Sequence, residues 1–212
     1  MESIINQLKG NFEIVVCDNC SNDGSREILQ DYAQKGKIKL IVERSSRGKG
    51  RQTAFENSTG QNIISGVDTD DILKPAFREF LDIYQRDHEG YMLSSHTIHI
   101  IPRALVEEIG GWKDLQYFED VDFVQRAESI GKKHELNDEL VLVERGKNKR
   151  AFTYRIMERY NAAICAYRIG KSVFIEVKSS EWFLKPIILV VALRAAVVCK
   201  LKHIKRVKYS ET

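Results

Sequence analysis

The sequence has no apolar run long enough to cross a membrane, because no window of roughly eighteen residues is both apolar and free of charge. Its N-terminus, residues 1–10, lacks the basic start and apolar stretch of a secretory signal, so we expect a cytoplasmic protein whose cysteines stay reduced. Only 3 prolines, 13 glycines and 4 cysteines occur in 212 residues, which excludes a collagen, a proline-rich scaffold and a disulfide-bonded miniprotein. Hydrophobic residues, at 43%, suffice for the core of one globular domain with a short appendage.

Charge divides the chain into two parts. Residues 1–150 hold 21 basic and 26 acidic residues, a net charge of −5, whereas residues 151–212 hold 12 and 4, a net charge of +8. An acidic body indicates cation or polar-ligand chemistry, and a basic, apolar tail indicates contact with an anionic surface. No recognised nucleic-acid motif accompanies the basic charge, so we expect phospholipid and no nucleic acid as that surface. The charged loop at residues 145–150 is the predicted boundary.

Apolar, β-rich runs alternate with helical patterns, which predicts an α/β fold with a mainly parallel central sheet flanked by helices. In the first ninety residues we expect strands at 12–17, 38–42 and 62–67 and helices at 25–34, 50–58 and 75–86. Beyond them we expect strands at 91–94, 97–101 and 139–144 and helices at 103–109, 119–130, 151–169 and 182–200. The last two helices form a C-terminal appendage.

Carboxylates directly follow two of the predicted strands. Asp18 comes after the first strand, and Asp68, Asp70 and Asp71 come after the third. Ligands of parallel sheets bind beyond the carboxyl ends of the strands. An Asp-x-Asp pair at such a position supplies oxygen ligands for a hard divalent cation, Mg²⁺ or Mn²⁺, which often bridges to a phosphate. The alternative is that Asp70 and Asp71 cap the helix that follows.

Residues 44–51 read RSSRGKGR and follow the second predicted strand. Glycines at 48 and 50 allow close backbone approach, and the cations Arg47, Lys49 and Arg51 suit a phosphate. The spacing is not that of a Walker loop. The alternative is a solvated basic turn.

A third acidic group, Glu119-Asp120-Val121-Asp122, begins a predicted helix. Glu119 and Asp122 share one face of that helix while Asp120 points elsewhere, so these carboxylates can have different roles. A carboxylate beside a bound donor can act as general base on an acceptor hydroxyl. The alternative is that the acidic turn only complements the helix dipole.

Four segments, in order over residues 12–131, resemble the motifs of family 2 glycosyltransferases, which have the GT-A fold. Residues 18–24 are similar to D-D/N-x-S-x-D-G, and residues 67–73 resemble the DxD box. The Gly-Lys-Gly at 48–50 resembles the loop of the polyprenyl-phosphate, dolichol-phosphate mannose synthase-like branch. Residues 109–112, 119–122 and Arg126 are similar to GG(F/W)…ED-x-D…R. Residues 1–149 would then be the catalytic domain and 150–212 its extension.

The resemblance implies an inverting, metal-dependent transfer of sugar from a UDP- or GDP-linked donor to an acceptor hydroxyl or lipid phosphate. Asp18 matches the carboxylate that binds the nucleobase, and Asp70 the ligand of Mg²⁺ or Mn²⁺ under the diphosphate. Asp68 matches the carboxylate near ribose and metal. Asp120 matches the catalytic base, with Glu119 beside it near the glycan or lipid-linked acceptor. The donor-binding set implied by the matching motifs is Asp18, Asn19, Ser21, Asp23, Lys49, Gly50 and Asp68.

Two family features are absent from the sequence. No Q-x-x-R-W follows the acidic helix, so we expect a non-processive enzyme. The P-x-Y-N strand with which members usually begin is also missing, and residues 1–8 resemble the helix that follows it. Two alternatives stay open: a catalytically inactive relative that binds a nucleotide or a partner, and a nucleotidyltransferase.

The tail combines an apolar stretch with basic residues. Residues 186–193 are apolar, Arg194 interrupts the run, and five cations lie within residues 200–208. This pattern fits an interfacial helix bound peripherally to an anionic membrane at its cytoplasmic face. The alternative is a C-terminal helix packed on the body of the protein.

Overall fold

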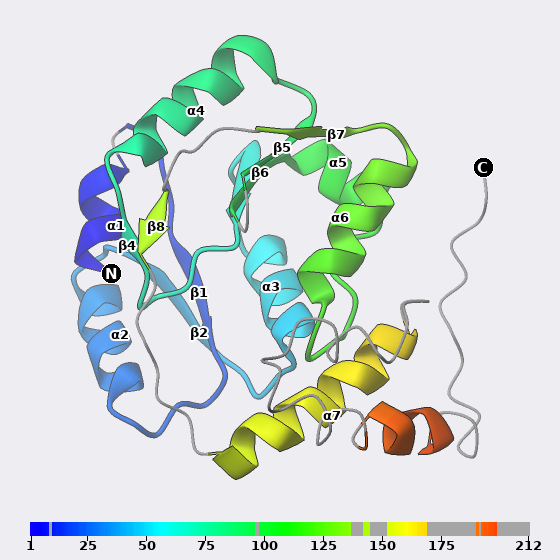
Figure 1. The fold of residues 1–212 in the computed structure, drawn as a ribbon. Helices are drawn as coiled ribbons and strands as arrows, with labels where there is room; N and C mark the ends of the chain where they lie inside the picture. The colour runs from blue at the N-terminus through cyan, green and yellow to red at the C-terminus, as the bar shows by residue number, and fades with distance from the viewer. Residues whose placement is uncertain are drawn as a thin grey trace.

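The computed structural model describes residues 1–8, 10–95, 98–136, 142–144, 152–168, 190 and 192–198. These residues form an α/β fold in which helices flank the strands (Figure 1). The strands are β1 (Val15–Asp18), β2 (Lys39–Val42), β3 (Asn62–Ser65), β4 (Ile72–Leu73), β5 (Met92–Ser95), β6 (Ile98–Pro102), β7 (Lys133–Glu135) and β8 (Val143–Glu144). The helices are α1 (Glu2–Gln7), α2 (Ser25–Gln34), α3 (Arg47–Glu56), α4 (Ala76–Asp87), α5 (Arg103–Glu108), α6 (Glu119–Ser129) and α7 (Phe152–Arg168).

The strands form separate hydrogen-bonded groups. β1 pairs in parallel with β2, and Val15 lies opposite Lys39. A second sheet has the order β3-β6-β5-β7, in which only β6 runs against the other strands. β4 and β8 form a short antiparallel ribbon. The expected α/β fold with helices flanking the strands is therefore confirmed, whereas only two of the five strand pairs among the described residues, β1–β2 and β5–β7, are parallel.

Two apolar clusters hold the helices to the strands. Phe77, Phe80 and Tyr84 of α4 recur at helical spacing and are buried with residues of α1, β5 and β6. The second cluster joins α3, α5 and α6 to β5 and β6 through residues such as Phe55 and Phe123. In Figure 1, α3 lies between the β1–β2 pair and α6, so this helix connects the two halves of the fold.

The segment expected as a basic glycine turn is helical. α3 begins at Arg47 and not at residue 50, because the Ser46 hydroxyl caps it by accepting a hydrogen bond from Lys49 N at 3.1 Å. The solvated-turn interpretation of residues 44–51 is therefore wrong for residues 47–51. The capping interpretation of Asp70 and Asp71 is wrong as well, because α4 has Pro75 at its N-cap and no side-chain cap.

The C-terminal appendage is described in part. α7 falls within the helix predicted at 151–169, and residues 192–198 are helical, as expected for 182–200. Ala195 is buried against Ala163 of α7. The predicted boundary at 145–150 and the cations at 200–208 lie outside the described residues. No helix in the part of the chain that the structure describes is long and apolar enough to span a membrane.

Candidate active site

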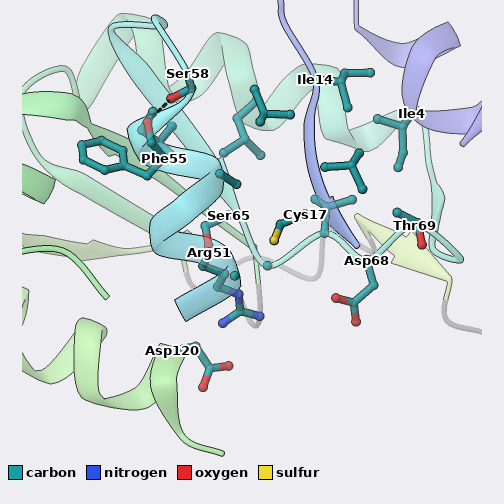
Figure 2. Close-up of a pocket in the computed structure, with 18 of the residues that line it drawn as sticks. Ile4, Ile14, Cys17, Arg51, Phe55, Ser58, Ser65, Asp68, Thr69 and Asp120 are labelled. Atoms are coloured by element: carbon teal, nitrogen blue, oxygen red, sulfur yellow. Dashed lines mark hydrogen bonds between the residues drawn. The ribbon is translucent and has the colours of Figure 1, made fainter. Parts of the chain in front are cut away.

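A cavity of about 1520 Å³ lies between β1 and β3 (Figure 2). Its lining includes residues that follow both strands, the first turns of α3 and the start of α6. Of the residues predicted to form the site, it brings together Asn19, Ser21, Gly50, Asp68, Glu119 and Asp120. It leaves Asp18, Asp23, Lys49 and Asp70 outside the lining.

Asp18 organises the loop after β1. Its carboxylate is almost fully buried and accepts hydrogen bonds from Ser21 N, at 3.1 Å and 3.3 Å, and from Arg26 Nε at 3.2 Å. Asn19 Oδ1 accepts from Ser45 N at 2.9 Å, which ties this loop to the end of β2. These bonds present Asn19 and Ser21 to the cavity. Asp23 instead accepts from Ser25 N at 3.1 Å, at the exposed start of α2.

The Asp-x-Asp segment is a turn in which the third carboxylate is structural. Asp71 is buried, and its Oδ2 accepts from Asp68 N at 2.9 Å. That bond leaves the carboxylates of Asp68 and Asp70 on the exposed side of the turn. The described residues contain no cluster of three metal-ligating side chains. Two exposed carboxylates fit Mg²⁺ or Mn²⁺, which take one or two carboxylates and complete their shell with water and substrate phosphate.

Gly48 is required by packing within the protein. A Cβ at this position would lie 1.9 Å from Lys113 O, and Gly48 N donates to Leu115 O at 2.9 Å. The close approach predicted for this glycine is therefore made to the backbone of residues 113–115. Gly50 has more room, since its Cβ would lie 3.2 Å from Ser45 Oγ, and it does line the cavity.

Arg51 brings a positive charge to the carboxylates. Its Nη1 lies 2.7 Å from Glu119 Oε1. Burial raises the pKa of Glu119, and the charge of Arg51 opposes that shift. Figure 2 shows the side chains of Arg51, Asp68 and Asp120 directed toward the same space. The sequence predicted Arg51 as a cation suited to a phosphate but did not include it in the donor-binding set or pair it with Glu119.

The chain is similar in sequence to known glycosyltransferases. The profile described as "Glycosyl transferase family 2" matches residues 1–109, which is more than half of the chain. The chain belongs to glycosyl transferase family 2. Among curated proteins, glycosyltransferase GlyA of Streptococcus pneumoniae is 34% identical over 83 residues, which are 38% of this chain and 12% of GlyA.

A second relative is the putative teichuronic acid biosynthesis glycosyltransferase TuaG of Bacillus subtilis. It is 30% identical over 74 residues, which are 34% of this chain and 29% of TuaG. This family 2 chain therefore spans less than a third of the length of either relative.

Two solved structures share the fold, which is of the GT-A type. Mannosyltransferase PcManGT from Pyrobaculum calidifontis, in complex with GDP-Man and Mn²⁺, matches with a TM-score of 0.57 and 18% identity over 89% of this chain and 66% of its own. S. aureus TarS 1-349, in complex with UDP, matches with a TM-score of 0.59 and 16% identity over 96% of this chain and 78% of its own.

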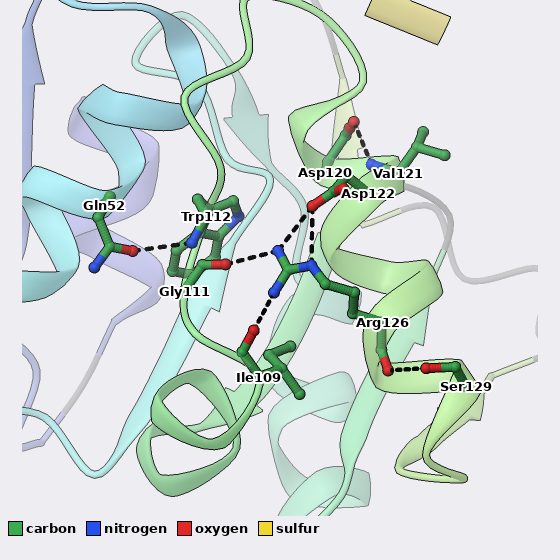
Figure 3. Close-up of polar contacts among 9 residues, drawn as sticks. All are labelled: Gln52, Ile109, Gly111, Trp112, Asp120, Val121, Asp122, Arg126 and Ser129. Atoms are coloured by element: carbon green, nitrogen blue, oxygen red, sulfur yellow. Dashed lines mark hydrogen bonds and ion pairs between the residues drawn. The ribbon is translucent and has the colours of Figure 1, made fainter. Parts of the chain in front are cut away.

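In this family 2 chain the start of α6 is fixed by hydrogen bonds of Arg126 (Figure 3). Arg126 donates to Asp122 Oδ2 at 3.0 Å and to the carbonyl oxygens of Ile109 and Gly111 at 2.5 Å and 2.6 Å. Glu119 and Asp122 are buried and Asp120 is half-buried, as expected if Glu119 and Asp122 share one face of the helix and Asp120 points elsewhere. The turn before Trp112 is thereby fixed to α6.

A second contact fixes the same turn to α3. Gln52 Oε1 accepts from Trp112 N at 2.9 Å, and a Cβ on Gly111 would lie 2.1 Å from that oxygen. The indole of Trp112 stacks on Phe123 of α6 with ring centroids 4.4 Å apart. Arg51 and Asp120, which lie on these two helices, are therefore held in a fixed relation.

His99 is a buried residue near the site that the sequence did not assign. Its Nδ1 is hydrogen-bonded to Ser94 Oγ at 3.0 Å. Burial lowers the pKa of His99 to about 4, while the negative charge of Asp120 acts in the opposite direction. At neutral pH the imidazole is therefore uncharged.

Proposed function

We propose that the protein is an inverting, non-processive glycosyltransferase that moves a sugar from a nucleotide-diphosphate sugar to an acceptor. The observation that carries the proposal is the meeting of Asp68, Arg51 and Asp120, from separate segments, around one cavity beyond the ends of β1 and β3. Family membership favours sugar transfer over nucleotidyl transfer.

Asp120 is the proposed general base. Its Oδ1 accepts from Val121 N at 2.8 Å, and the residue lines the cavity, where an acceptor hydroxyl can reach the carboxylate. The hydroxyl proton moves to Asp120, the hydroxyl oxygen bonds to the anomeric carbon, and the bond to the diphosphate breaks with both electrons on the leaving oxygen. Glu119 is buried and paired with Arg51, so we assign it to positioning that cation near the acceptor.

A divalent cation, Mg²⁺ or Mn²⁺, is the proposed cofactor, and Asp68 and Asp70 would hold it. Such an ion offsets negative charge on the departing nucleoside diphosphate. The similar PcManGT structure holds GDP-Man and Mn²⁺, and the TarS structure holds UDP, which supports a nucleotide-sugar donor. The proposed donor site is completed by Asp18, Asn19, Ser21, Asp23, Lys49 and Gly50. Of these, Asn19, Ser21 and Gly50 line the cavity, and Asp18 holds Ser21 in place. The Gly-Lys-Gly at 48–50 is similar to the loop of the polyprenyl-phosphate branch.

We also propose that the C-terminal extension binds peripherally to the cytoplasmic face of an anionic membrane. Val190, Leu193 and Val197 share one face of the helix that packs on α7, and they are 66%, 49% and 54% exposed. This apolar stripe precedes the cations of residues 200–208. A lipid-linked acceptor or a glycan near the membrane would suit that position.

Titration of the full chain with UDP- and GDP-sugars, with and without Mn²⁺, tests the proposal. Metal-dependent binding, followed by release of nucleoside diphosphate and inversion at the anomeric carbon when an acceptor is added, is the expected result. Among the described residues β1 pairs only with β2 and β3 only with β6, so no strand joins β1 to β3 beside the cavity. This observation favours a second candidate, a nucleotide-binding protein without transferase activity. Binding without turnover over a panel of hydroxyl and polyprenyl-phosphate acceptors would select that candidate.

A further inference from the structure

His99 lies at the end of the sheet that borders the cavity. In the pairing of β3 with β6, Ser65 lies opposite His99, and in the pairing of β6 with β5, Ser94 lies opposite His99. Ser65 lines the cavity (Figure 2). Residues that lie opposite each other in antiparallel strands have neighbouring side chains on one face of the sheet. His99 is therefore one strand away from the cavity lining, between two serines.

The side chain of His99 points to the face of the sheet that α6 covers. Along β6, Ile98 and Ile100 pack in the cluster that holds α4. Ile101 packs instead in the cluster that contains Phe123 of α6. Because successive side chains of a strand point to opposite faces, His99 shares the α6 face with Ile101.

The first turn of α6 lies over His99. This turn contains Asp120, which lines the cavity, and the last turn leads into β7 at the opposite end of the sheet. Phe123, about one turn after the start of α6, belongs to the cluster of Ile101. One helical turn spans about 5.4 Å, and the two strand residues from Ile101 back to His99 span about 6.6 Å. The helix turn with Asp120 therefore stands above His99.

The charged groups that face His99 come from three elements. They are Asp120 of α6, Arg51 of α3, and Lys133 and Glu135 of β7. Lys133 Nζ lies 2.5 Å from Glu135 Oε2, so these two charges largely offset each other. Burial lowers the pKa of His99 to about 4, which keeps the imidazole neutral at pH 7. A neutral imidazole has one N–H donor and one acceptor nitrogen, so the tautomer decides what His99 offers to Asp120.

The hydrogen bond with Ser94 fixes the tautomer of His99. Ser94 is 1% exposed, and within the described residues its hydroxyl has no hydrogen-bond partner other than His99 Nδ1, at 3.0 Å. A buried hydroxyl that donates to nothing is costly, so Ser94 Oγ donates and His99 Nδ1 accepts. The proton of the neutral ring is then on Nε2, on the side of the ring away from Nδ1.

We propose that His99 is a positioning residue for Asp120: its Nε2–H donates a hydrogen bond to the Asp120 carboxylate, directly or through a water molecule. This inference rests on the proposed role of Asp120 as general base. Asp120 Oδ1 accepts from Val121 N at 2.8 Å, so Oδ2 is the oxygen for His99. A carboxylate oxygen has two lone pairs, so Oδ2 can accept this bond and still take the proton of the acceptor.

The first test measures the tautomer and needs no turnover. In the full chain at pH 7, nitrogen NMR of ¹⁵N-labelled imidazoles should show His99 with Nε2 protonated and Nδ1 unprotonated. Asp120→Asn should shift the His99 Nε2–H resonance, because it removes the negative charge of the partner. Asp82→Asn, an exposed change on α4, should leave the resonance in place. A protonated Nδ1, or an Nε2–H resonance that Asp120→Asn does not move, would overturn the proposal.

The second test compares two amide replacements of His99. The amide nitrogen of glutamine can take the place of Nε2, whereas that of the shorter asparagine reaches only the position of Nδ1. We expect His99→Gln to keep kcat within about threefold of the wild type. We expect His99→Asn to lower kcat about tenfold at unchanged donor affinity, since the carboxylate loses a hydrogen bond that orients it.

The pH profile separates positioning from packing. Loss of a donor disfavours the charged carboxylate, so His99→Asn should move the acidic limb of kcat/KM to higher pH by about one unit, and His99→Gln should not. Equal loss in both variants with an unmoved limb would assign His99 to packing and overturn the proposal. A wild-type chain that transfers no sugar would contradict the proposed function, and the NMR result would then decide the contact between His99 and Asp120.

Discussion

Neighbouring acidic residues in this protein have different surroundings, which makes their roles separable. Asp120 lines the cavity, whereas Glu119 is 3% exposed and paired with Arg51. We expect Asp120→Asn to keep donor affinity within about twofold and to lower the transfer rate roughly 100- to 10,000-fold, because only the proton acceptor is lost. Calorimetry and single-turnover rates measure the two effects. Transfer at the wild-type rate would assign the base to another carboxylate.

The two carboxylates of the Asp-x-Asp turn allow a matched test of the metal site. Asp68→Asn and Asp70→Asn should each reduce Mn²⁺-dependent donor affinity by at least tenfold, because each removes a charged oxygen ligand. Asp82→Asn is the control, since Asp82 is exposed on α4 and belongs neither to the cavity lining nor to the proposed donor site. Donor titrations with Mn²⁺ and with chelator give the comparison. Unchanged affinity in both turn variants would remove the metal from this position.

His99 predicts a pH dependence of stability. Its pKa is about 4 in the folded protein and near 6.5 when unfolded, so the unfolded chain binds the proton more tightly. The contribution of His99 to the free energy of unfolding is therefore fully present above pH 6.5. As the pH falls toward 4, roughly 3 kcal/mol of it is lost.

Urea unfolding of the wild type and His99→Asn at pH 7 and pH 4 measures this loss. The wild type should have the higher free energy of unfolding at pH 7, and its difference from the variant should shrink by roughly 3 kcal/mol at pH 4. Contributions common to both proteins cancel in this difference. A constant difference across this range would show that His99 is accessible to protons in the folded state.

At the scale of elements, α3 depends on one glycine for its position. Gly48→Ala would place Cβ against the backbone oxygen of Lys113, and we expect a loss of about 1–3 kcal/mol in the free energy of unfolding. Gly50→Ala is the control in the same helix, because its Cβ would meet side-chain atoms alone, Ser45 Oγ at 3.2 Å and Cys17 Sγ at 3.6 Å. Chemical denaturation of both variants is the measurement. Equal stability of the two would show that residues 113–115 move away freely.

Most elements were predictable from the periodicity of their own residues. The spacing of Phe77, Phe80 and Tyr84 predicts α4 to within one residue at each end. The start of α3 was missed because the glycines at 48 and 50 resemble a loop, and the cap that begins the helix depends on Ser46. β4 and β7 were also missed, since strands of two or three residues carry too little pattern to be recognised.

For the whole molecule, the positions of motifs in the sequence predicted which residues reach the cavity, but they did not predict which side chains contact one another. The carboxylates at strand ends and at the acidic helix were identified, and Asp68 and Asp120 do reach one cavity. Asp18 was expected to face the ligand, yet its carboxylate is held by Ser21 and Arg26. Sequence could not show this, because hydrogen bonds inside a loop depend on its backbone conformation.

The positive charge of residues 151–212 underlies the prediction that the C-terminal extension binds an anionic membrane. We expect the full chain to float with anionic liposomes at low salt and to lose binding as ionic strength rises. Leu193→Glu with Val197→Glu should abolish flotation, because the exposed stripe becomes charged while buried Ala195 stays in place. Flotation of this double variant at the wild-type level would show that the stripe does not contact lipid.

Gly48 and Gly111 limit, in different ways, the substitutions that related chains can accept. Gly48 opposes a backbone oxygen, so no side-chain replacement elsewhere makes room for it, and position 48 should be invariant wherever this packing persists. Gly111 opposes the Gln52 side chain and has a φ of +65°. Position 111 should therefore accept asparagine, which tolerates that backbone, only in chains where position 52 has become small. Positions 111 and 52 should therefore covary.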